Sequence, residues 1–468
     1  MTATPHLPPA LAEAVARPVW WGEQDPEPVS EPLTGRTAAD LVVVGAGLTG
    51  LWTAIEATIE HPGLRVLLLE GGVVGSGASG RNGGFVSDSL THGLTHGAAT
   101  EPRDLTTLLR LGRENLRQIA DFVAAEGIDA DLRMCGKTVV ATRAHEVPHL
   151  RAAYELYQRW GEDAELLDRE ALAQDVRSPT YLAGLRIRSG GGLVDPYRLL
   201  RGLLASAQDR GAVLHERTPV EGLSREKGGP VLVRTRAGTI RAGRVVLATN
   251  AYPPLLRRIR ARVLPVWDHV VATAPLTDDQ LQAIGWPDRQ GITDSGNQFH
   301  YYRLTPDDRL LFGGYDAIYY YGNDTHPSRE QRNASHAMLV RNLRKTFPAL
   351  TEHPITHRWA GLVDTTSRFT AYFGTSHGGR VAFAVGYTGL GVAASRFGAQ
   401  VALDLVQGRT TERTQLHMVR QAPLPFPAEP ARWLAVQATR GALAREDASG
   451  RRGPLLRALD RFGVGFNN

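Results

Sequence analysis

A strand, a glycine-rich turn and a helix follow one another between residues 40 and 60, and this succession limits the fold more than any other feature. The apolar residues 41–44 predict a buried parallel strand, and residues 51–60 predict a helix. Between them stand Gly45, Ala46, Gly47, Leu48, Thr49 and Gly50. In such a turn the first glycine permits the bend, the second admits a pyrophosphate and the third allows close helix packing. The segment therefore predicts a dinucleotide site at a helix N-terminus.

A second strand and an acidic residue strengthen this prediction. Residues 64–69 are apolar except for Arg65 and lead into Glu70 and Gly71, where a carboxylate can accept hydrogen bonds from ribose hydroxyls. A glycine pattern alone is weak evidence in a chain with 50 glycines. Strand, glycines, helix, strand and acid in this order are much stronger evidence. Residues 75–84 then form another glycine-rich loop, which an ordinary nicotinamide site does not need.

The second loop carries a family resemblance. Its residues Ala78, Ser79, Gly80, Arg81, Asn82, Gly83 and Gly84 resemble the FAD-dependent amine and amino-acid oxidoreductases of the D-amino-acid oxidase and glycine oxidase family. Within it they are most similar to the branch that contains gamma-glutamylputrescine oxidoreductase. The resemblance extends, with gaps, from about residue 40 to about residue 408. It implies FAD as cofactor, with this loop over the pyrophosphate and under the flavin ring.

The resemblance also implies the fold and further cofactor contacts. The expected fold is α/β, or α+β overall, with a Rossmann-type FAD-binding domain interleaved with an antiparallel-sheet substrate domain. Further contacts are expected at Val220 (adenine), Ala248, Thr249, Trp359, Gly361, Gly386, Thr388, Gly389, Leu390 and Gly391. The last five precede a helix whose backbone donors and dipole can hold the flavin's pyrimidine edge. Sarcosine-oxidising relatives place a lysine for the substrate carboxylate where this chain has Thr365, which argues against a simple N-methyl amino acid.

These features divide the chain into expected domains. Residues 37–90, 190–255 and 355–410 are expected in the FAD-binding domain, and residues 91–189 and 256–354 in the substrate domain. Residues 1–36 are proline-rich and predict an arm that packs through Trp20 and Trp21. Residues 411–468 predict a helical tail in which Trp433, Val436 and Leu443 dock on the body.

The expected reaction oxidises an amine or amino-acid carbon–nitrogen bond to an imine by hydride transfer to flavin N5, and O2 then reoxidises the flavin to give H2O2. Two segments near residues 263–273 and 299–304 are rich in aromatic and β-branched residues and predict strands of an antiparallel sheet. The resemblance implies that this sheet roofs the flavin and supplies the substrate pocket. His269 and Tyr302 are the catalytic candidates, and His269 would stabilise negative charge during reoxidation. A satisfied core histidine is the alternative for His269. Tyr315, Tyr319, Tyr320 and Tyr321 can wall an amine pocket or pack between strands.

Composition bounds the remaining possibilities. The single cysteine, Cys135, excludes an intrachain disulfide and suits a reducing cytoplasm. It lies outside the expected flavin segments, so the FAD is expected to be non-covalent. The chain has no uninterrupted stretch of about 18 apolar residues, so no transmembrane helix is expected. The formal net charge is +5, but the arginines are scattered, which favours compositional bias over a nucleic-acid site.

Several alternatives bear on partners. A dehydrogenase that passes electrons to a quinone or a carrier protein is the alternative enzyme. A basic, flavin-containing module that binds RNA is the alternative of another class. His145, Glu146 and His149 match a zinc protease pattern, but Pro148 inside it would interrupt the single helix that such a site needs, so no metal is expected.

Overall fold

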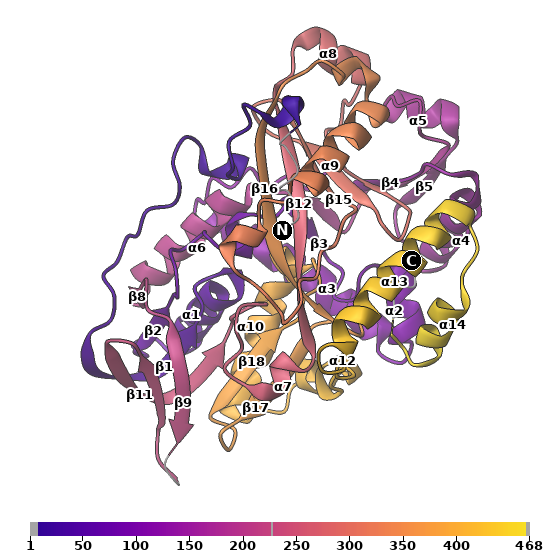
Figure 1. Ribbon diagram of the computed structural model, residues 1–468. Helices are drawn as coiled ribbons and strands as arrows, with labels where there is room; N and C mark the ends of the chain where they lie inside the picture. The colour runs from indigo at the N-terminus through magenta and orange to yellow at the C-terminus, as the bar shows by residue number, and fades with distance from the viewer. Residues whose placement is uncertain (1–7, 226–227, 465–468) are drawn as a thin grey trace.

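The computed structural model describes residues 8–225 and 228–464, and it has a mixed α/β architecture built on two large sheets (Figure 1). Each of these sheets contains eight strands. The predicted fold class is confirmed. Residues 1–7 of the expected arm and 465–468 of the expected tail lie outside the described residues.

The first sheet carries the strand with which the sequence analysis began. Its strands are β17 (Tyr372–Ser376), β18 (Val381–Val385), β11 (Gly238–Leu247), β1 (Gly35–Val44), β2 (Val66–Leu69) and β8 (Val213–His215), with β10 (Val231–Thr235) paired to β11 and β9 (Val220–Arg225) to β10. β1 is parallel to both β2 and β11. The predicted strands at residues 41–44 and 64–69 therefore lie side by side at the centre of this sheet.

Helices cover one face of this sheet. They are α1 (Leu48–Glu60), α3 (Leu105–Ala125), α6 (Pro196–Asp209) and α10 (Gly391–Gln407). Val43 of β1 packs toward them, whereas Val42 and Val44 pack with residues of β10 and β11 on the other face. Burial on both faces explains why β1 is a continuous apolar run rather than an alternating one. The predicted helix begins at Leu48, three residues before its expected start.

The second sheet forms the other half of the molecule. Its order is β16 (Ile355–Thr366), β12 (Val263–Pro275), β15 (Arg309–Gly314), β14 (His300–Leu304), β13 (Gly291–Asp294), β4 (Lys137–Ala141), β6 (Ala183–Ile187) and β5 (Ala164–Leu167). All of its pairs are antiparallel except β13 with β4. β16 falls in the segment 355–410 that was expected in the FAD-binding domain, yet it pairs with β12 in this sheet.

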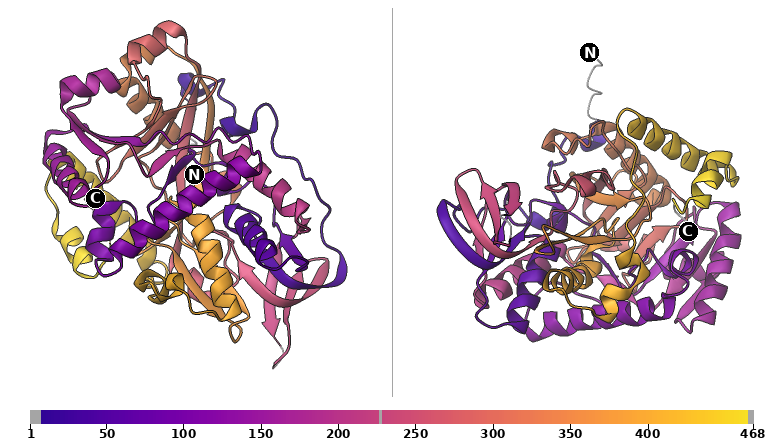
Figure 2. Two further views of the ribbon diagram at one scale, coloured as in Figure 1. Left: turned by 180° about the vertical axis from the view of Figure 1, so that it is seen from behind. Right: turned by 90° about the horizontal axis from the view of Figure 1, so that it is seen from below.

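Smaller elements connect the two sheets and pack around them. They are β3 (Phe85–Ser87), β7 (Gly191–Leu193), α2 (Leu94–Thr100), α4 (Val147–Arg159), α5 (Arg169–Asp175), α7 (Arg257–Arg260), α8 (Asp278–Ile284), α9 (Asn333–Thr346), α11 (Glu412–Gln415), α12 (His417–Arg420), α13 (Ala431–Ser449) and α14 (Pro454–Arg461). Seen from behind in Figure 2, the long α3 crosses the molecule diagonally. None of the helices within the described ranges is long and apolar enough to cross a membrane.

The N-terminal arm docks on the glycine-rich loop that follows β2, as its tryptophans predicted. Trp20 Nε1 donates to the carbonyl of Asn82 at 2.9 Å, and Trp21 Nε1 donates to the carbonyl of Gly80 at 3.1 Å. The buried Glu216, which follows β8, accepts from the amides of Val29 at 2.5 Å and Ser30 at 3.0 Å. The described part of the arm therefore follows the edge of the molecule (Figure 1), and it is tied to the body at residues 20–21 and again at residues 29–30.

Candidate functional site

The turn between β1 and α1 leaves no room for side chains. Gly45 has φ +100°, and a Cβ there would lie 2.5 Å from the carbonyl oxygen of Ala248 at the end of β11. A Cβ at Gly50 would lie 1.8 Å from the carbonyl oxygen of Gly45, and one at Gly47 would lie 2.7 Å from Ser79 Oγ. The three glycines bring the β1–α1 turn, the end of β11 and the second glycine loop together. We call this region, with the loop 386–391 and with Trp359 and Gly361 of β16 described below, the cradle.

Glu70 stands at the end of β2 and is tied to the same turn. Its carboxylate accepts from the amide of Ala46 at 3.0 Å and from that of Gly72 at 2.9 Å. Burial raises the pKa of Glu70. A Cβ at Gly71 would lie 3.8 Å from Pro219, which directly precedes Val220 at the start of β9. The three residues predicted for the adenosine half are thus neighbours at one end of the cradle.

The second glycine loop crosses the start of α1. Ser79 Oγ accepts from the amide of Leu48 at 3.0 Å, and the Asn82 side chain bridges the carbonyl of Ser79 and the amide of Gly84 at 3.0 and 2.9 Å. Arg81 forms an ion pair with Glu330 at 2.5 Å and lies 4.6 Å from the ring centre of Trp21. The loop is therefore held by its own side chains and by the arm.

A third loop completes the cradle, and a residue that the sequence analysis missed holds it. The buried Asp364 of β16 accepts hydrogen bonds from the amides of Gly386 and Tyr387. Burial raises its pKa to about 7. Gly386, Thr388 and Gly389 have φ +80°, +52° and +94°, and α10 begins at Gly391 just after Leu390. Asp364 and the two amides are far apart in the sequence and come together only in the folded chain. The sequence therefore offered no local signal for Asp364.

β16 and β11 join the third loop to the other two. Trp359 Nε1 donates to the carbonyl of Arg81 at 2.8 Å, and a Cβ at Gly361 would lie 3.8 Å from Arg81 Cβ. Asn250, which follows Ala248 and Thr249, donates to the carbonyl of Leu362 at 3.1 Å. The residues predicted for the flavin half therefore converge on one region. Glycines that exclude side chains, two helix N-termini and a carboxylate at the end of β2 form a set that fits FAD.

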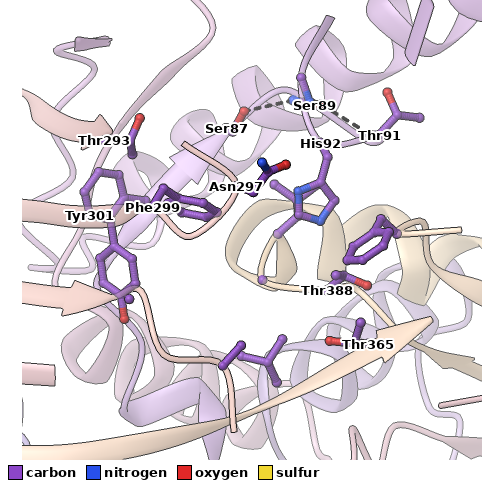
Figure 3. Close-up of a pocket in the computed structure, with 18 of the residues that line it drawn as sticks. Ser87, Ser89, Thr91, His92, Thr293, Asn297, Phe299, Tyr301, Thr365 and Thr388 are labelled. Carbon is purple, nitrogen blue, oxygen red and sulfur yellow. Dashed lines mark hydrogen bonds between the residues drawn. The ribbon is translucent and has the colours of Figure 1, made fainter. Parts of the chain in front are cut away.

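A cavity of about 920 Å³ opens beside the cradle. Residues of the cradle line it, among them Arg81, Gly83, Gly361, Thr388 and Leu390. The rest of its wall comes from the second sheet, from β3, β7 and the residues 88–93 that follow β3, from α2, α3 and α4, and from the tail. In Figure 3, Thr293, Phe299 and Tyr301 lie across the open space from His92 and Thr388. Its size is in the range of small-molecule sites.

Neither catalytic candidate faces this cavity. Asp268 and Val270 of β12 line it, so His269 between them points to the opposite face, where its ring meets that of His336 at 5.1 Å. Burial lowers the pKa of His269 well below its usual value. Tyr302 is also buried on the far face, with its hydroxyl 2.7 Å from that of Tyr181. The expected position of both residues near the flavin is therefore corrected.

Their chain neighbours face the cavity instead. Asp268 lies opposite Gly361 in the β12–β16 register, and the Tyr301 hydroxyl donates to its Oδ2 at 2.5 Å. Burial raises the pKa of Asp268 to about 6. A Cβ at Gly313 of β15 would lie 2.6 Å from the Tyr301 ring, so this glycine lets the ring lean across β15 toward β12. A glycine inside a strand indicates such a close approach, and this was the available signal.

The remaining predicted positions fall into two groups. Thr365, Tyr315 and Tyr319 line the cavity, whereas Tyr321 is exposed. Cys135 does not line it, and burial raises the pKa of the thiol.

The glutamate of the zinc-protease pattern has a structural role. Glu146 accepts from the amides of Thr142 and Arg143 at 2.7 and 3.0 Å, and α4 begins only at Val147. Within residues 8–225 and 228–464, no group of three or more His, Cys, Asp or Glu side chains is arranged to hold a metal ion.

The C-terminal tail forms part of the cavity wall. Val436 and Leu443 of α13 line the cavity, as their predicted docking implied, whereas Trp433 stays 38% exposed. Asp447 near the end of α13 accepts from the amides of Asn297 at 2.9 Å and Gln298 at 2.8 Å. These two residues belong to the loop before β14 that also lines the cavity. The tail therefore positions this loop as well as covering it.

Comparison with known proteins agrees with this geometry. Residues 40–405 match the model of a family described as FAD dependent oxidoreductase (DAO). The chain is 30% identical over 386 residues to gamma-glutamylputrescine oxidoreductase of Escherichia coli, covering 81% of this chain and 86% of that protein.

Solved structures share the fold. The structure of glycine oxidase from Geobacillus kaustophilus matches with a TM-score of 0.69 and 22% identity, covering 83% of this chain and 100% of the other. That of L-proline dehydrogenase from P. horikoshii matches with a TM-score of 0.66 and 20% identity, covering 82% and 96%.

Proposed function

The chain belongs to the DAO family of FAD-dependent oxidoreductases, which act on amines and amino acids, and from this premise we propose that it oxidises an amine carbon–nitrogen bond to an imine. The observation that carries the proposal is the Asp268–Tyr301 pair. It stands in a largely apolar cavity and directly beside Gly361 of the cradle. A carboxylate can bind the ammonium group of an amine, and an aromatic ring beside it can pack against that group.

The chain's own residues would bind and orient the substrate. The pKa of Asp268 is about 6, so the group is an anion at neutral pH and attracts an ammonium group. The Tyr301 hydroxyl fixes the orientation of that carboxylate at 2.5 Å, and Asp268 can take up the amine proton through its other oxygen. The apolar wall excludes water, which strengthens this attraction.

The cradle would hold the cofactor. Its glycines at 45, 47 and 50 admit the pyrophosphate, Glu70 would meet the ribose, and the loop 386–391 would hold the flavin ring. When bound, FAD would supply the electron acceptor, taking a hydride from the carbon beside nitrogen, and O2 would be the oxidant that restores it with release of H2O2. We propose non-covalent attachment, because Cys135 does not line the cavity. The single cysteine also supports a reducing compartment, which we propose to be the cytoplasm.

The decisive experiment is anaerobic titration of the purified holoprotein with a panel of amines, read in the visible band of the oxidised flavin. Bleaching by an amine, followed by recovery in air with stoichiometric H2O2, is the expected result. Bleaching that air does not reverse, but that a quinone reverses, would replace the oxidase by a dehydrogenase. A flavin that no amine or amino acid bleaches would overturn the proposal. Retention of tRNA in a salt-dependent manner would instead favour an RNA-binding role.

A further inference from the structure

The cavity face of the second sheet carries a row of polar side chains. Thr365 of β16, Asp268 of β12, Tyr301 of β14, Thr293 of β13 and Lys137 of β4 all line the cavity. Their neighbours on the same face, such as Val266, Val363, Val139 and Leu185, are apolar. Five strands of this face thus offer polar groups in an apolar wall, which is the usual composition of a site that orients a ligand.

The two ends of this row differ in charge. At one end Asp268 stands beside Gly361 of the cradle. Tyr301 pairs with Thr293 in the β14–β13 register, and Thr293 pairs with Val139 of β4, so Lys137 lies two strands beyond Tyr301. Asp268 lies on β12, and β15, β14 and β13 stand between β12 and β4. Neighbouring strands are about 4.8 Å apart, so the backbones of β12 and β4 are roughly 19 Å apart. The cavity therefore has an anionic end beside the cradle and a cationic group farther away.

Lys137 differs from the other cations that line the cavity. Arg81, Arg440 and Arg452 are ion-paired with Glu330, Asp316 and Glu446, and Arg432 donates to Asn323. In the part of the chain that the structure describes, the Lys137 ammonium has neither a hydrogen bond nor a salt bridge. A cation in an apolar wall is costly unless something pairs with it. Its donors are therefore available to a ligand.

Asp88 is the protein's own candidate partner. Its charge acts on Lys137, but the two groups lie beyond salt-bridge distance. The Asp88 carboxyl instead lies against Gly190, where a Cβ would be 2.5 Å from its Oδ2. Glu162 also acts on Asp88 and is itself paired with Arg113. None of these groups uses the donors of Lys137.

We propose that Lys137 binds a carboxylate of the substrate, and that the preferred substrate is an amine with a carboxylate at the far end of a chain that reaches from β12 to β4, which are four strand spacings or roughly 19 Å apart at the backbone. The inference rests on the proposed amine oxidation and adds the substrate class. An ammonium is a compact point charge with three donors, which suits a single carboxylate. Asp268 and Lys137 would then read the two ends of one substrate.

The test compares three series of amines of increasing chain length: ω-amino carboxylates, their primary amides and plain alkylamines. Both kcat/KM and the dissociation constant, from perturbation of the flavin spectrum or from calorimetry, are measured. The wild type should prefer the longer carboxylates to their amides. Lys137→Met should weaken carboxylate binding about 10- to 100-fold, because a hydrogen bond to a charged group is lost. Lys137→Arg should restore most of the preference.

Matched variants separate this role from a structural one. Lys345 is exposed on α9, so Lys345→Met removes the same charge elsewhere and should change neither constant. Asp88→Asn should tighten carboxylate binding, because it removes an opposing anion. The unfolding temperature of Lys137→Met should equal or exceed that of the wild type, since an unpaired charge has been removed.

The outcomes distinguish the two proposals. A wild type that oxidises plain amines but binds carboxylates and amides equally overturns the role of Lys137 and leaves amine oxidation standing. Equal loss of binding for carboxylates, amides and alkylamines in Lys137→Met would also overturn it, because that result indicates a structural role. If no amine is oxidised, the dissociation constants still decide whether Lys137 selects a carboxylate.

Discussion

The cradle and the cavity face of the second sheet are built on different principles, although they share a boundary. The cradle works through backbone: at Gly45, Gly50 and Gly80 a Cβ would lie within 2.5 Å of a carbonyl oxygen. The cavity face, in contrast, offers side chains to a ligand. Successive residues of a strand point to opposite faces of the sheet, so only every second residue can reach the cavity. Binding by backbone tolerates few substitutions, whereas binding by side chains can change with each one.

The largest effect should come from the cradle. Gly50→Ala places a Cβ 1.8 Å from the Gly45 carbonyl oxygen, and neither backbone segment can yield. Overpacking of this severity costs about 3 kcal/mol or more. We expect FAD to be lost, as measured by the ratio of flavin to protein absorbance. Gly453→Ala, where no atom lies within 4 Å, is the matched control. Full FAD content in Gly50→Ala would contradict the view that the cradle holds FAD through backbone that has no room for side chains.

The next effect tests which face of β12 carries the chemistry. Asp268→Asn should lower kcat/KM for cationic amines about 10- to 100-fold, because a charge-assisted contact becomes neutral. In the wild type kcat/KM should rise with pH through the pKa of Asp268 at about 6, and this rise should disappear in the variant. His269→Gln, on the opposite face, should lower the unfolding temperature and keep the pH profile. The reverse pattern would restore His269 as the catalytic residue.

A smaller effect concerns stability. Burial raises the pKa of Asp268 from 3.8 to about 6, so the folded protein favours the protonated form. Its stabilisation is complete below the unfolded pKa and is lost as the pH rises through about 6. Two pKa units correspond to roughly 3 kcal/mol at most. Asp268→Asn should therefore unfold at a higher temperature than the wild type at pH 8, and the difference should vanish near pH 4. Calorimetry at both pH values measures it, and a lower unfolding temperature at pH 8 would contradict it.

The smallest effect should come from the arm, which supports the cradle from outside. Trp20→Phe removes the donor to the Asn82 carbonyl but keeps most of the ring. One hydrogen bond contributes about 1 kcal/mol, so the dissociation constant of FAD should rise about fivefold. Reconstitution of the apoprotein measures this constant. Trp433→Phe, which is 38% exposed on the tail, is the control. An unchanged constant in Trp20→Phe would show that the arm does not support the cradle.

The same contrast explains what the sequence could predict. Glycines at fixed spacing between a strand and a helix are local signals, so the sequence could single out residues 45–50 and 79–84, and the structure brings these two loops together. Their contact with FAD stays a prediction. The sequence analysis chose His269 and Tyr302, whereas their neighbours Asp268 and Tyr301 are the residues that line the cavity. β12 and β14 are buried on both faces, so their composition does not alternate and does not reveal which residues face the cavity.

Long-range placement was the other limit. Asp364 is separated from the amides it holds by more than 20 positions, and the assignment of β16 to the second sheet depends on its pairing with β12. Neither contact leaves a pattern in the local sequence. The tail, in contrast, was expected to dock because its helix carries apolar residues, and the structure adds that it docks on the cavity.

That tail has a consequence for how such a protein could diversify. The family match ends at residue 405, yet Val436, Leu443 and Asp447 shape the cavity from beyond that point. A wall encoded downstream of the shared unit can be exchanged by a single recombination event or shortened by an early stop codon. Related proteins could thereby acquire new substrates while keeping the same cofactor site. Sequence variation at the 3′ end of the gene is therefore expected to accompany changes in substrate specificity.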